Sequence, residues 1–317
     1  MAVQRRGNVK TADTTPFEKQ IKRVILQSQT KSPYRGYIVP LLALIGTVAL
    51  LTWLCSVWTN DNTETMVSQE EVLTQPRVFM VQCSEDYQKY KHFPDVLSSG
   101  CTPMKCGRAV SDSVVTADEA RALKRLAEKG LALGGSDGGA SILDLHSGAM
   151  SMGRKFINIY RYFNDQIRDI FTEEDFELYR VVRGRIQTVI AETFGLDSSQ
   201  LYLTKPTFFS RINSTSAKTP HDEYWHPHID KVTYGSFDYT SLLYLTDYGV
   251  DFIGGRFIFM DINRNRTVEP RAGRVSFFSS GSENLHRVEK VAWGTRYAIT
   301  VSFTCDPDYA IADPSLP

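Results

Sequence analysis

The chain has 317 residues, of which 42% are hydrophobic and 23% are charged, and its formal net charge is zero. This length allows one large domain with an extension or two small domains, and the composition is typical of a globular core. A neutral chain has no long-range positive field, so we expect no nucleic acid among its partners.

An apolar segment near the N-terminus predicts a membrane span. Residues 37–58 contain no charged side chain, and 22 helical residues at about 1.5 Å each cover roughly 33 Å, enough for a hydrocarbon core of about 30 Å. Residues 1–36 carry eight Lys or Arg against two acids, whereas residues 59–75 carry four acids and no base. Basic flanks stay cytoplasmic, so this pattern predicts a single-pass type II membrane protein whose C-terminal part is lumenal or extracellular. We expect the endoplasmic reticulum or Golgi, and the sequence leaves the plasma membrane open as an alternative.

Changes in composition divide the chain into five parts. The predicted organisation is a basic cytoplasmic tail (1–36), one transmembrane helix (37–58), an acidic stalk (59–76), a lumenal N-terminal region with a helix (77–172) and a C-terminal domain (173–317). A capping box at Thr116 predicts the start of the helix in the N-terminal region. The glycine-rich residues 134–141 follow a helix rather than a strand, so they are interpreted as a flexible loop and not as a phosphate-binding loop.

The C-terminal domain begins with a helix and continues with strands. Thr172 is a candidate N-cap, a broad apolar stripe follows it, and Gly195 is a candidate stop. Beyond Gly195, short runs rich in aromatic and β-branched residues alternate with turn residues, which predicts a catalytic β core over about residues 200–305. Many short strands after a helical half indicate an α+β protein with a jelly-roll core and supporting helices.

Two further features are typical of the secretory pathway. Asn213 and Asn265 begin Asn-x-Ser/Thr triplets and are candidate glycosylation sites. Four cysteines beyond the apolar segment could form disulfides in an oxidising compartment: Cys83, Cys101, Cys106 and Cys305. Four cysteines allow three complete pairings, and their spacing does not choose among them.

Histidines in the β-rich region suggest a metal site. His228 and Asp230 are two residues apart, so on an extended chain both side chains point to the same face. His286 follows a predicted strand 56 residues after Asp230. Two histidines and one carboxylate leave coordination positions open on one side of an ion, as non-haem iron(II) oxygenases require.

Arg296 lies ten residues after His286 and strengthens this interpretation. On its predicted strand, Arg296 shares one face with Ala298 and Thr300, whereas the alternating residues on the other face are plainly core residues. A permanent charge on a face of small residues indicates a bound anion. The planar guanidinium binds carboxylates in a bidentate manner, which suits the distal carboxylate of 2-oxoglutarate.

These positions resemble the iron and cosubstrate motif of the prolyl-hydroxylase-like 2-oxoglutarate oxygenases. The residues that carry the resemblance are His228, Asp230, His286, Arg296, the turn at Gly254 and Gly255, Tyr244 and Thr300. In that family Tyr244 would share the distal carboxylate with Arg296, and Thr300 would lie beside the open iron position. An upstream tyrosine of some relatives has no counterpart in register, although Tyr224 lies near that place.

The resemblance implies a fold, cofactors and an activity. It implies a double-stranded β-helix that binds Fe(II), 2-oxoglutarate and O2, with ascorbate as an additional cofactor. It also implies hydroxylation of a protein or peptide side chain, prolyl or lysyl in type, with decarboxylation of 2-oxoglutarate to succinate.

Two other functions remain open on the sequence. A zinc-dependent enzyme could use His226, His228 and His286, although this hypothesis leaves Asp230 and Arg296 without a role. A lumenal binding module could keep the fold without turnover. We expect His226 to be a structural residue at the rim of the site.

Overall fold

The computed structural model describes residues 35–58, 63–89 and 100–316, with side chains of the first range described from Pro40 to Thr52. The chain divides into two units, Met1–Asp61 and Asn62–Pro317. Most of the predicted basic tail therefore lies outside the described residues.

The first unit contains helix α2 (Arg35–Trp58), which covers the predicted apolar segment. Among the described residues, no helix is both long enough and apolar enough to cross a membrane. The predicted membrane span at residues 37–58 is therefore not confirmed.

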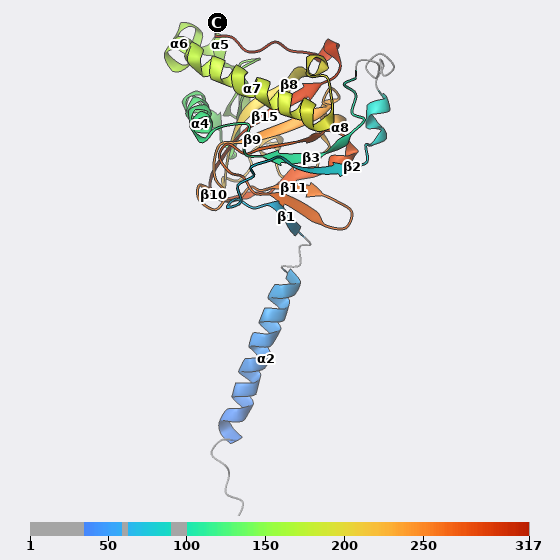
Figure 1. The fold of residues 1–317 in the computed structure, drawn as a ribbon. Helices are drawn as coiled ribbons and strands as arrows, with labels where there is room; N and C mark the ends of the chain where they lie inside the picture. The colour runs from blue at the N-terminus through green and yellow to red at the C-terminus, as the bar shows by residue number, and fades with distance from the viewer. Residues whose placement is uncertain (1–34, 59–62, 90–99, 317) are drawn as a thin grey trace, which may run out of the picture. The chain divides into compact units, whose positions relative to one another are not determined.

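The second unit is built on two β-sheets (Figure 1). Within its described residues, eleven strands form the large sheet and four form the small one. The large sheet runs in the order β2 (Arg77–Val81), β3 (Cys106–Ser111), β13 (Val275–Ser279), β9 (Tyr239–Tyr244), β15 (Val291–Thr304), β8 (Tyr202–Asn213), β5 (Ala140–Leu143), β6 (Ala149–Gly153) and β4 (Gly135–Ser136), with β10 (Phe252–Gly254) beside β15 and β7 (Lys155–Asn158) beside β6. The small sheet runs in the order β1 (Thr63–Val67), β12 (Asn265–Val268), β11 (Phe257–Met260) and β14 (His286–Val288).

Helices cover one face of the large sheet, and the small sheet lies on the other side (Figure 1). The α-helices in the described residues of this unit are α4 (Ala117–Leu131), α5 (Ile159–Phe163), α6 (Ile167–Ile170), α7 (Glu173–Phe194) and α8 (Asp230–Tyr234). Short 3-10 turns are η1 (Glu85–Lys89), η2 (Asn164–Gln166), η3 (Ser198–Gln200), η4 (Pro220–Asp222), η5 (Ser282–Asn284) and η6 (Pro307–Tyr309).

Local sequence signals explain where the two long helices begin and end. The Thr116 side chain accepts a hydrogen bond from the Glu119 amide in a complete capping box, and Thr172 does the same at the start of α7. Gly195 ends α7 in the left-handed conformation, which a residue with a Cβ rarely adopts. Both predicted helices are confirmed.

Two hydrophobic clusters hold the layers together. The larger one packs α4 and α7 against the large sheet, with buried Leu123 and Ile186 from the helices and Phe277 from β13. The smaller one lies between the sheets, where Tyr244 of β9 and Phe257 of β11 are both buried. The result is a sheet-rich α+β fold whose two facing sheets are consistent with the predicted jelly-roll core.

Two segments differ from the sequence-based expectation. Part of the predicted stalk, residues 59–76, forms strand β1, which pairs in parallel with β12 and buries Met66 and Val67. The stalk assignment is wrong here because these apolar side chains complete the cluster between the sheets. The predicted flexible loop, residues 134–141, includes β4 and the start of β5, so part of it is bound into the sheet.

These four cysteines, Cys83, Cys101, Cys106 and Cys305, form two disulfides, Cys83–Cys106 and Cys101–Cys305. The structure thus selects one of the three pairings that the sequence leaves open.

Candidate functional site

His228, Asp230 and His286 lie together, with His286 at the start of β14, the edge strand of the small sheet. His228 and His286 form an isolated antiparallel bridge, in which the His228 amide donates to the His286 carbonyl at 2.9 Å and the His286 amide donates back at 3.1 Å. Asp230 is the first residue of α8, not part of a strand. The expected extended geometry therefore holds up to Ile229, after which the chain turns into a helix and still brings the carboxylate to the two imidazoles.

Among the His, Cys, Asp and Glu side chains of the described residues, these three form a group that could hold one metal ion. Their ligand atoms all lie within 4.8 Å of one another. The Asp230 Oδ1 atom lies 3.6 Å from Nε2 of His228 and 3.7 Å from Nε2 of His286. Ligand atoms about 2.1 Å from one ion are separated by roughly 3–4 Å, so these distances fit a single ion.

Backbone carbonyls orient both imidazoles. Nδ1 of His228 lies 3.0 Å from the His226 carbonyl, and Nδ1 of His286 lies 2.8 Å from the Asn284 carbonyl. A carbonyl only accepts hydrogen bonds, so Nδ1 carries the proton and Nε2 presents its lone pair to the other ligands. Burial lowers the pKa of His286, which favours the neutral form that binds metal.

Hydroxyl groups orient the carboxylate. Thr240 donates to Asp230 Oδ2 at 2.7 Å, which leaves Oδ1 facing the histidines. Thr240 is 2.9 Å from the Ser280 hydroxyl, and since its single proton is given to Asp230, Ser280 is the donor of that second bond. Around His286, Phe257 stacks at a centroid distance of 4.9 Å and closes the site on the side of the small sheet.

The ligand set opens into a cavity of about 250 Å³. Its walls are mostly apolar, and its polar lining includes Arg296 and Thr300 of β15. The side chains that line it are Ala140, Ser141, Ile142, Phe208, Ser210, Ile212, His221, Tyr224, His228, Asp230, Tyr234, Phe237, Thr240, Leu242, Phe257, His286, Val288, Arg296 and Thr300.

Arg296 is buried in the cavity wall with part of its guanidinium unpaired. Its Nε donates to the Gly255 carbonyl at 2.9 Å, whereas its Nη2 has no hydrogen-bond partner among the described residues. Gly255 has a φ of +66°, and a Cβ at that position would come within 3.1 Å of the arginine side chain. A buried cation with a free donor calls for an anionic partner in the cavity.

Two other candidate residues have different positions relative to the cavity. Thr300 lines it, as the family motif implies. Tyr244 is fully buried outside the lining, with its hydroxyl 2.9 Å from Ser276 Oγ and its ring centroid 5.5 Å from the Arg296 guanidinium. Tyr244 therefore packs against the arginine and does not itself face the cavity.

Sequence reasoning did not place Tyr224, which lines the cavity and whose hydroxyl accepts a hydrogen bond from the Val291 amide at 2.8 Å. Its position depends on a loop contact with β15, for which the sequence carries no periodic signal. His226 lies apart from the metal-ligand group: it is exposed, and its Nε2 is 2.7 Å from Glu223. The zinc site of three histidines is therefore wrong, whereas the rim position expected for His226 agrees with its exposure.

Comparisons with known proteins agree with this site. A family model described as the 2OG-Fe(II) oxygenase superfamily matches residues 213–304, which include the three candidate ligands and Arg296. A Mus musculus protein named 2-oxoglutarate and iron-dependent oxygenase domain-containing protein 3 is 56% identical over 320 residues and covers 100% of both chains. The chain belongs to the 2OG-Fe(II) oxygenase superfamily. The family resemblance inferred from the sequence is thereby confirmed.

More distant similarity covers only part of this oxygenase. Prolyl 3-hydroxylase 2 of Rattus norvegicus is 32% identical over 138 residues, which are 38% of this chain and 19% of that protein. A solved prolyl hydroxylase from Trichoplax adhaerens, in complex with a hypoxia inducible factor peptide fragment, is 15% identical with a TM-score of 0.41 and covers 67% of this chain and 86% of that one.

Proposed function

We propose that the protein is a dioxygenase that uses Fe(II), 2-oxoglutarate and O2 to hydroxylate a prolyl or lysyl side chain of a protein or peptide. The observation that carries this proposal is the shared cavity, which is lined both by three side chains that could hold a metal ion and by a buried arginine with an unpaired donor. We also propose that the core is a double-stranded β-helix, because the unit is built on two sheets and the family model matches residues 213–304.

Each residue of the site has a defined task in this proposal. Nε2 of His228, Nε2 of His286 and Oδ1 of Asp230 would hold Fe(II) at the wall of the cavity. Arg296 binds the distal carboxylate of 2-oxoglutarate through its free donor. Bound iron and 2-oxoglutarate supply the oxidising chemistry, in which O2 gives one atom to succinate and one to the substrate with release of CO2. Ascorbate is proposed as the reductant that keeps the iron as Fe(II).

Neighbouring side chains determine how well these groups are held. Tyr244 packs against the guanidinium and positions Arg296, a more limited role than direct contact with the carboxylate. Thr300 lines the cavity beside Arg296 on the same strand. The apolar walls, including Phe208 and Leu242, exclude water and suit an aliphatic substrate side chain.

Calorimetry with 2-oxoglutarate on purified residues 62–317, followed by a succinate assay, tests the proposal. Asp230→Ala should abolish binding of both Mn(II) and 2-oxoglutarate, because the ligand and its charge are lost. Arg296→Ala should keep the metal but weaken 2-oxoglutarate by roughly 2–5 kcal/mol, about thirty- to several-thousand-fold, and Arg296→Lys should restore part of that loss. Arg264→Ala removes an exposed guanidinium outside the cavity and serves as the matched control.

Two outcomes would contradict the assignment. Unchanged 2-oxoglutarate affinity in Arg296→Ala would show that Arg296 does not bind the cosubstrate. Metal and 2-oxoglutarate binding without any succinate, even with protein extract from the secretory pathway, would instead favour a binding module.

We further propose that the oxygenase unit works in the secretory pathway, in the endoplasmic reticulum or Golgi. Its two disulfides suit an oxidising compartment.

Glycosylation of Asn213 and Asn265, and membrane anchoring by residues 37–58, remain predictions from the sequence. In cells, an endoglycosidase should increase the gel mobility of the protein, and changing both asparagines to Gln should abolish the shift. Protease protection of the N-terminal tail in sealed microsomes, in place of the C-terminal domain, would contradict the type II topology.

A further inference from the structure

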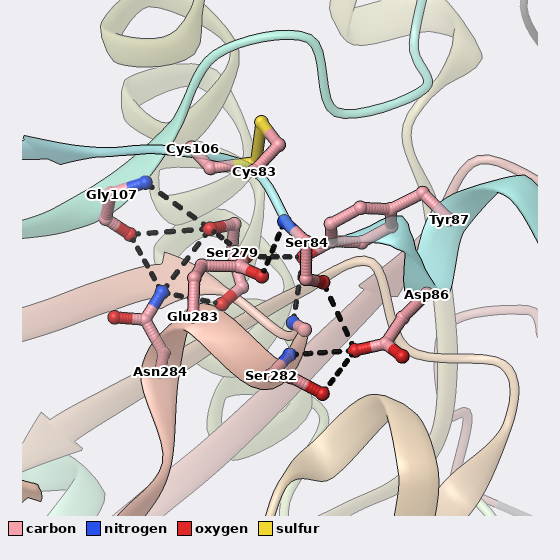
Figure 2. Close-up of a disulfide and its surroundings, with 11 residues drawn as sticks. Cys83, Ser84, Asp86, Tyr87, Cys106, Gly107, Ser279, Ser282, Glu283 and Asn284 are labelled. Carbon is pink, nitrogen blue, oxygen red and sulfur yellow. Dashed lines mark hydrogen bonds between the residues drawn. A yellow bond between two sulfur atoms is a disulfide. The ribbon is translucent and has the colours of Figure 1, made fainter.

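The loop that carries His286 is held by a separate N-terminal segment. Residues 279–286, here called the ligand loop, run from the end of β13 to the third candidate metal ligand. Residues 83–89, here called the tethered segment, begin at Cys83 and include η1. Figure 2 shows the two segments side by side, with the Cys83–Cys106 disulfide above them.

Three residues of the tethered segment, Ser84, Asp86 and Tyr87, form hydrogen bonds with the ligand loop. Tyr87, which is buried, donates its hydroxyl proton to Glu283 at 2.6 Å and accepts a bond from the Gly281 amide at 2.6 Å (Figure 2). Asp86 accepts from the Ser282 amide at 2.7 Å.

The Ser84 amide also donates to the Glu283 carboxylate, at 3.2 Å. Burial raises the pKa of Tyr87 well above its usual value, so the phenol keeps the proton that it donates.

The ligand loop passes this restraint directly to His286. The Asn284 carbonyl accepts the Nδ1 proton of His286 at 2.8 Å. The same Asn284 is fixed by its side-chain amide, which donates to the Ser279 carbonyl at 2.8 Å and to the Gly107 carbonyl at 3.2 Å. Gly107 follows Cys106, so the disulfide joins the tethered segment to the strand that supports Asn284.

We propose that the tethered segment positions the His286 imidazole, with Tyr87 as the principal positioning residue and the Cys83–Cys106 disulfide as its anchor. This inference rests on the proposed metal site. Groups that orient a metal-binding histidine change metal affinity by about 10- to 100-fold when they are removed. Tyr87 does not line the cavity, and both hydrogen bonds of its hydroxyl go to the ligand loop, so this hydroxyl acts on the site through that loop.

Tyr87→Phe tests the proposal with a single deleted hydroxyl. Co(II) is the probe, because its visible absorption spectrum reports the number and geometry of its ligands. We expect Tyr87→Phe to weaken Co(II) binding about tenfold and to alter the spectrum, because His286 is less firmly held. Asp86→Ala, which removes a half-buried contact of the same segment, and the double change Cys83→Ala with Cys106→Ala should weaken Co(II) binding in the same direction.

Tyr160→Phe is the matched control, because Tyr160 also donates its hydroxyl to a protein acceptor, the Leu145 carbonyl, but lies outside the ligand loop and the cavity. Thermal midpoints of the metal-free proteins separate loss of fold stability from loss of positioning. Equal Co(II) affinity and equal spectra in Tyr87→Phe and Tyr160→Phe would overturn the proposal, whatever the thermal midpoints. If wild-type protein bound no Co(II), the proposed function itself would be wrong as well.

Discussion

Hydrogen bonds behind the candidate metal ligands distinguish the two oxygens of Asp230 and the two nitrogens of each histidine. Thr240 binds one carboxylate oxygen, and backbone carbonyls bind Nδ1 of both His228 and His286. The three atoms that remain, Oδ1 of Asp230 and Nε2 of each histidine, lie within 4.8 Å of one another. The orientation of the candidate ligands therefore depends on residues that contact them from behind, namely Thr240 and the carbonyls of His226 and Asn284. These residues are not part of the metal-binding motif.

Thr240→Val tests this layer. The substitution keeps the shape of the side chain but removes the donor to Asp230 Oδ2, so the carboxylate can rotate and Mn(II) affinity should fall by about tenfold. Calorimetric titration with Mn(II) measures the change. Thr267→Val, at a buried threonine of β12 outside the cavity, should leave Mn(II) affinity unchanged; a similar loss in both variants would point to general destabilisation.

His146 gives a second prediction at the residue scale, on the pH dependence of stability. Its imidazole contacts the Ala312 carbonyl at 3.0 Å and the Tyr179 hydroxyl at 2.9 Å. Burial lowers the pKa of His146, and this exceeds the opposing effects of the Ala312 hydrogen bond and of Asp144 and Asp313; Arg183 acts in the same direction as burial.

The unfolded chain therefore binds a proton at His146 more readily than the folded chain does. As pH falls below about 6.5, the usual histidine pKa, this difference lowers the free energy of unfolding until the lowered pKa of the folded state is passed. Urea unfolding of metal-free protein at pH 7.5 and 5.5 should show a smaller pH-dependent loss in His146→Gln than in wild type. An identical loss in the two proteins would refute the assignment.

At the scale of elements, one buried arginine explains why β1 and the residues after it belong to the sandwich. Arg274 is fully buried, and its guanidinium donates to the carbonyls of Ser68 at 2.9 Å and Glu71 at 2.6 Å. It also forms a bidentate pair with Asp112, at 2.8 and 3.0 Å. The segment that the sequence assigns to a stalk is therefore fixed by a residue about 200 positions away.

Arg274→Met should lower the free energy of unfolding by about 3–5 kcal/mol, because it leaves the buried Asp112 carboxylate without its charged partner. Chemical denaturation measures this. Arg264→Ala, which removes a surface pair with Glu64, should cost less than about 1 kcal/mol, since both side chains of that pair are about half exposed. Comparable losses in the two variants would contradict the proposed role of Arg274.

At the scale of the whole second unit, the Cys101–Cys305 disulfide encloses most of the residues in one covalent loop. Cys101 and Cys305 are both buried and 204 residues apart in sequence, so their bond joins the N-terminal region to the end of β15. The pair therefore restrains the unfolded chain over a loop that contains the whole β-rich core of residues 200–305.

Peptide mapping without reduction should find Cys101 linked to Cys305 and Cys83 linked to Cys106. Changing Cys101 and Cys305 together to Ala should lower the free energy of unfolding on the order of 2–5 kcal/mol, measured by denaturation without reductant. Complete alkylation of all four cysteines before reduction would show that neither bond forms.

The sequence by itself determined the parts of this protein that depend on local chemistry. Capping residues fixed the starts of α4 and α7, because a cap is a contact within one helical turn. The candidate metal ligands and Arg296 could be proposed because few other residue types can bind an ion or a carboxylate in that pattern. Membership of the family followed from those residues.

Only the tertiary structure decided what depends on contacts between distant segments. The cysteine pairing, the place of β1 in the small sheet, the approach of Tyr224 to the cavity and the hold of Tyr87 on the ligand loop all join residues far apart in the chain. Such contacts leave no periodic signal, because each depends on the packing of the complete fold. The clustering of the three candidate ligands was therefore predictable, whereas the groups that hold them in place were not.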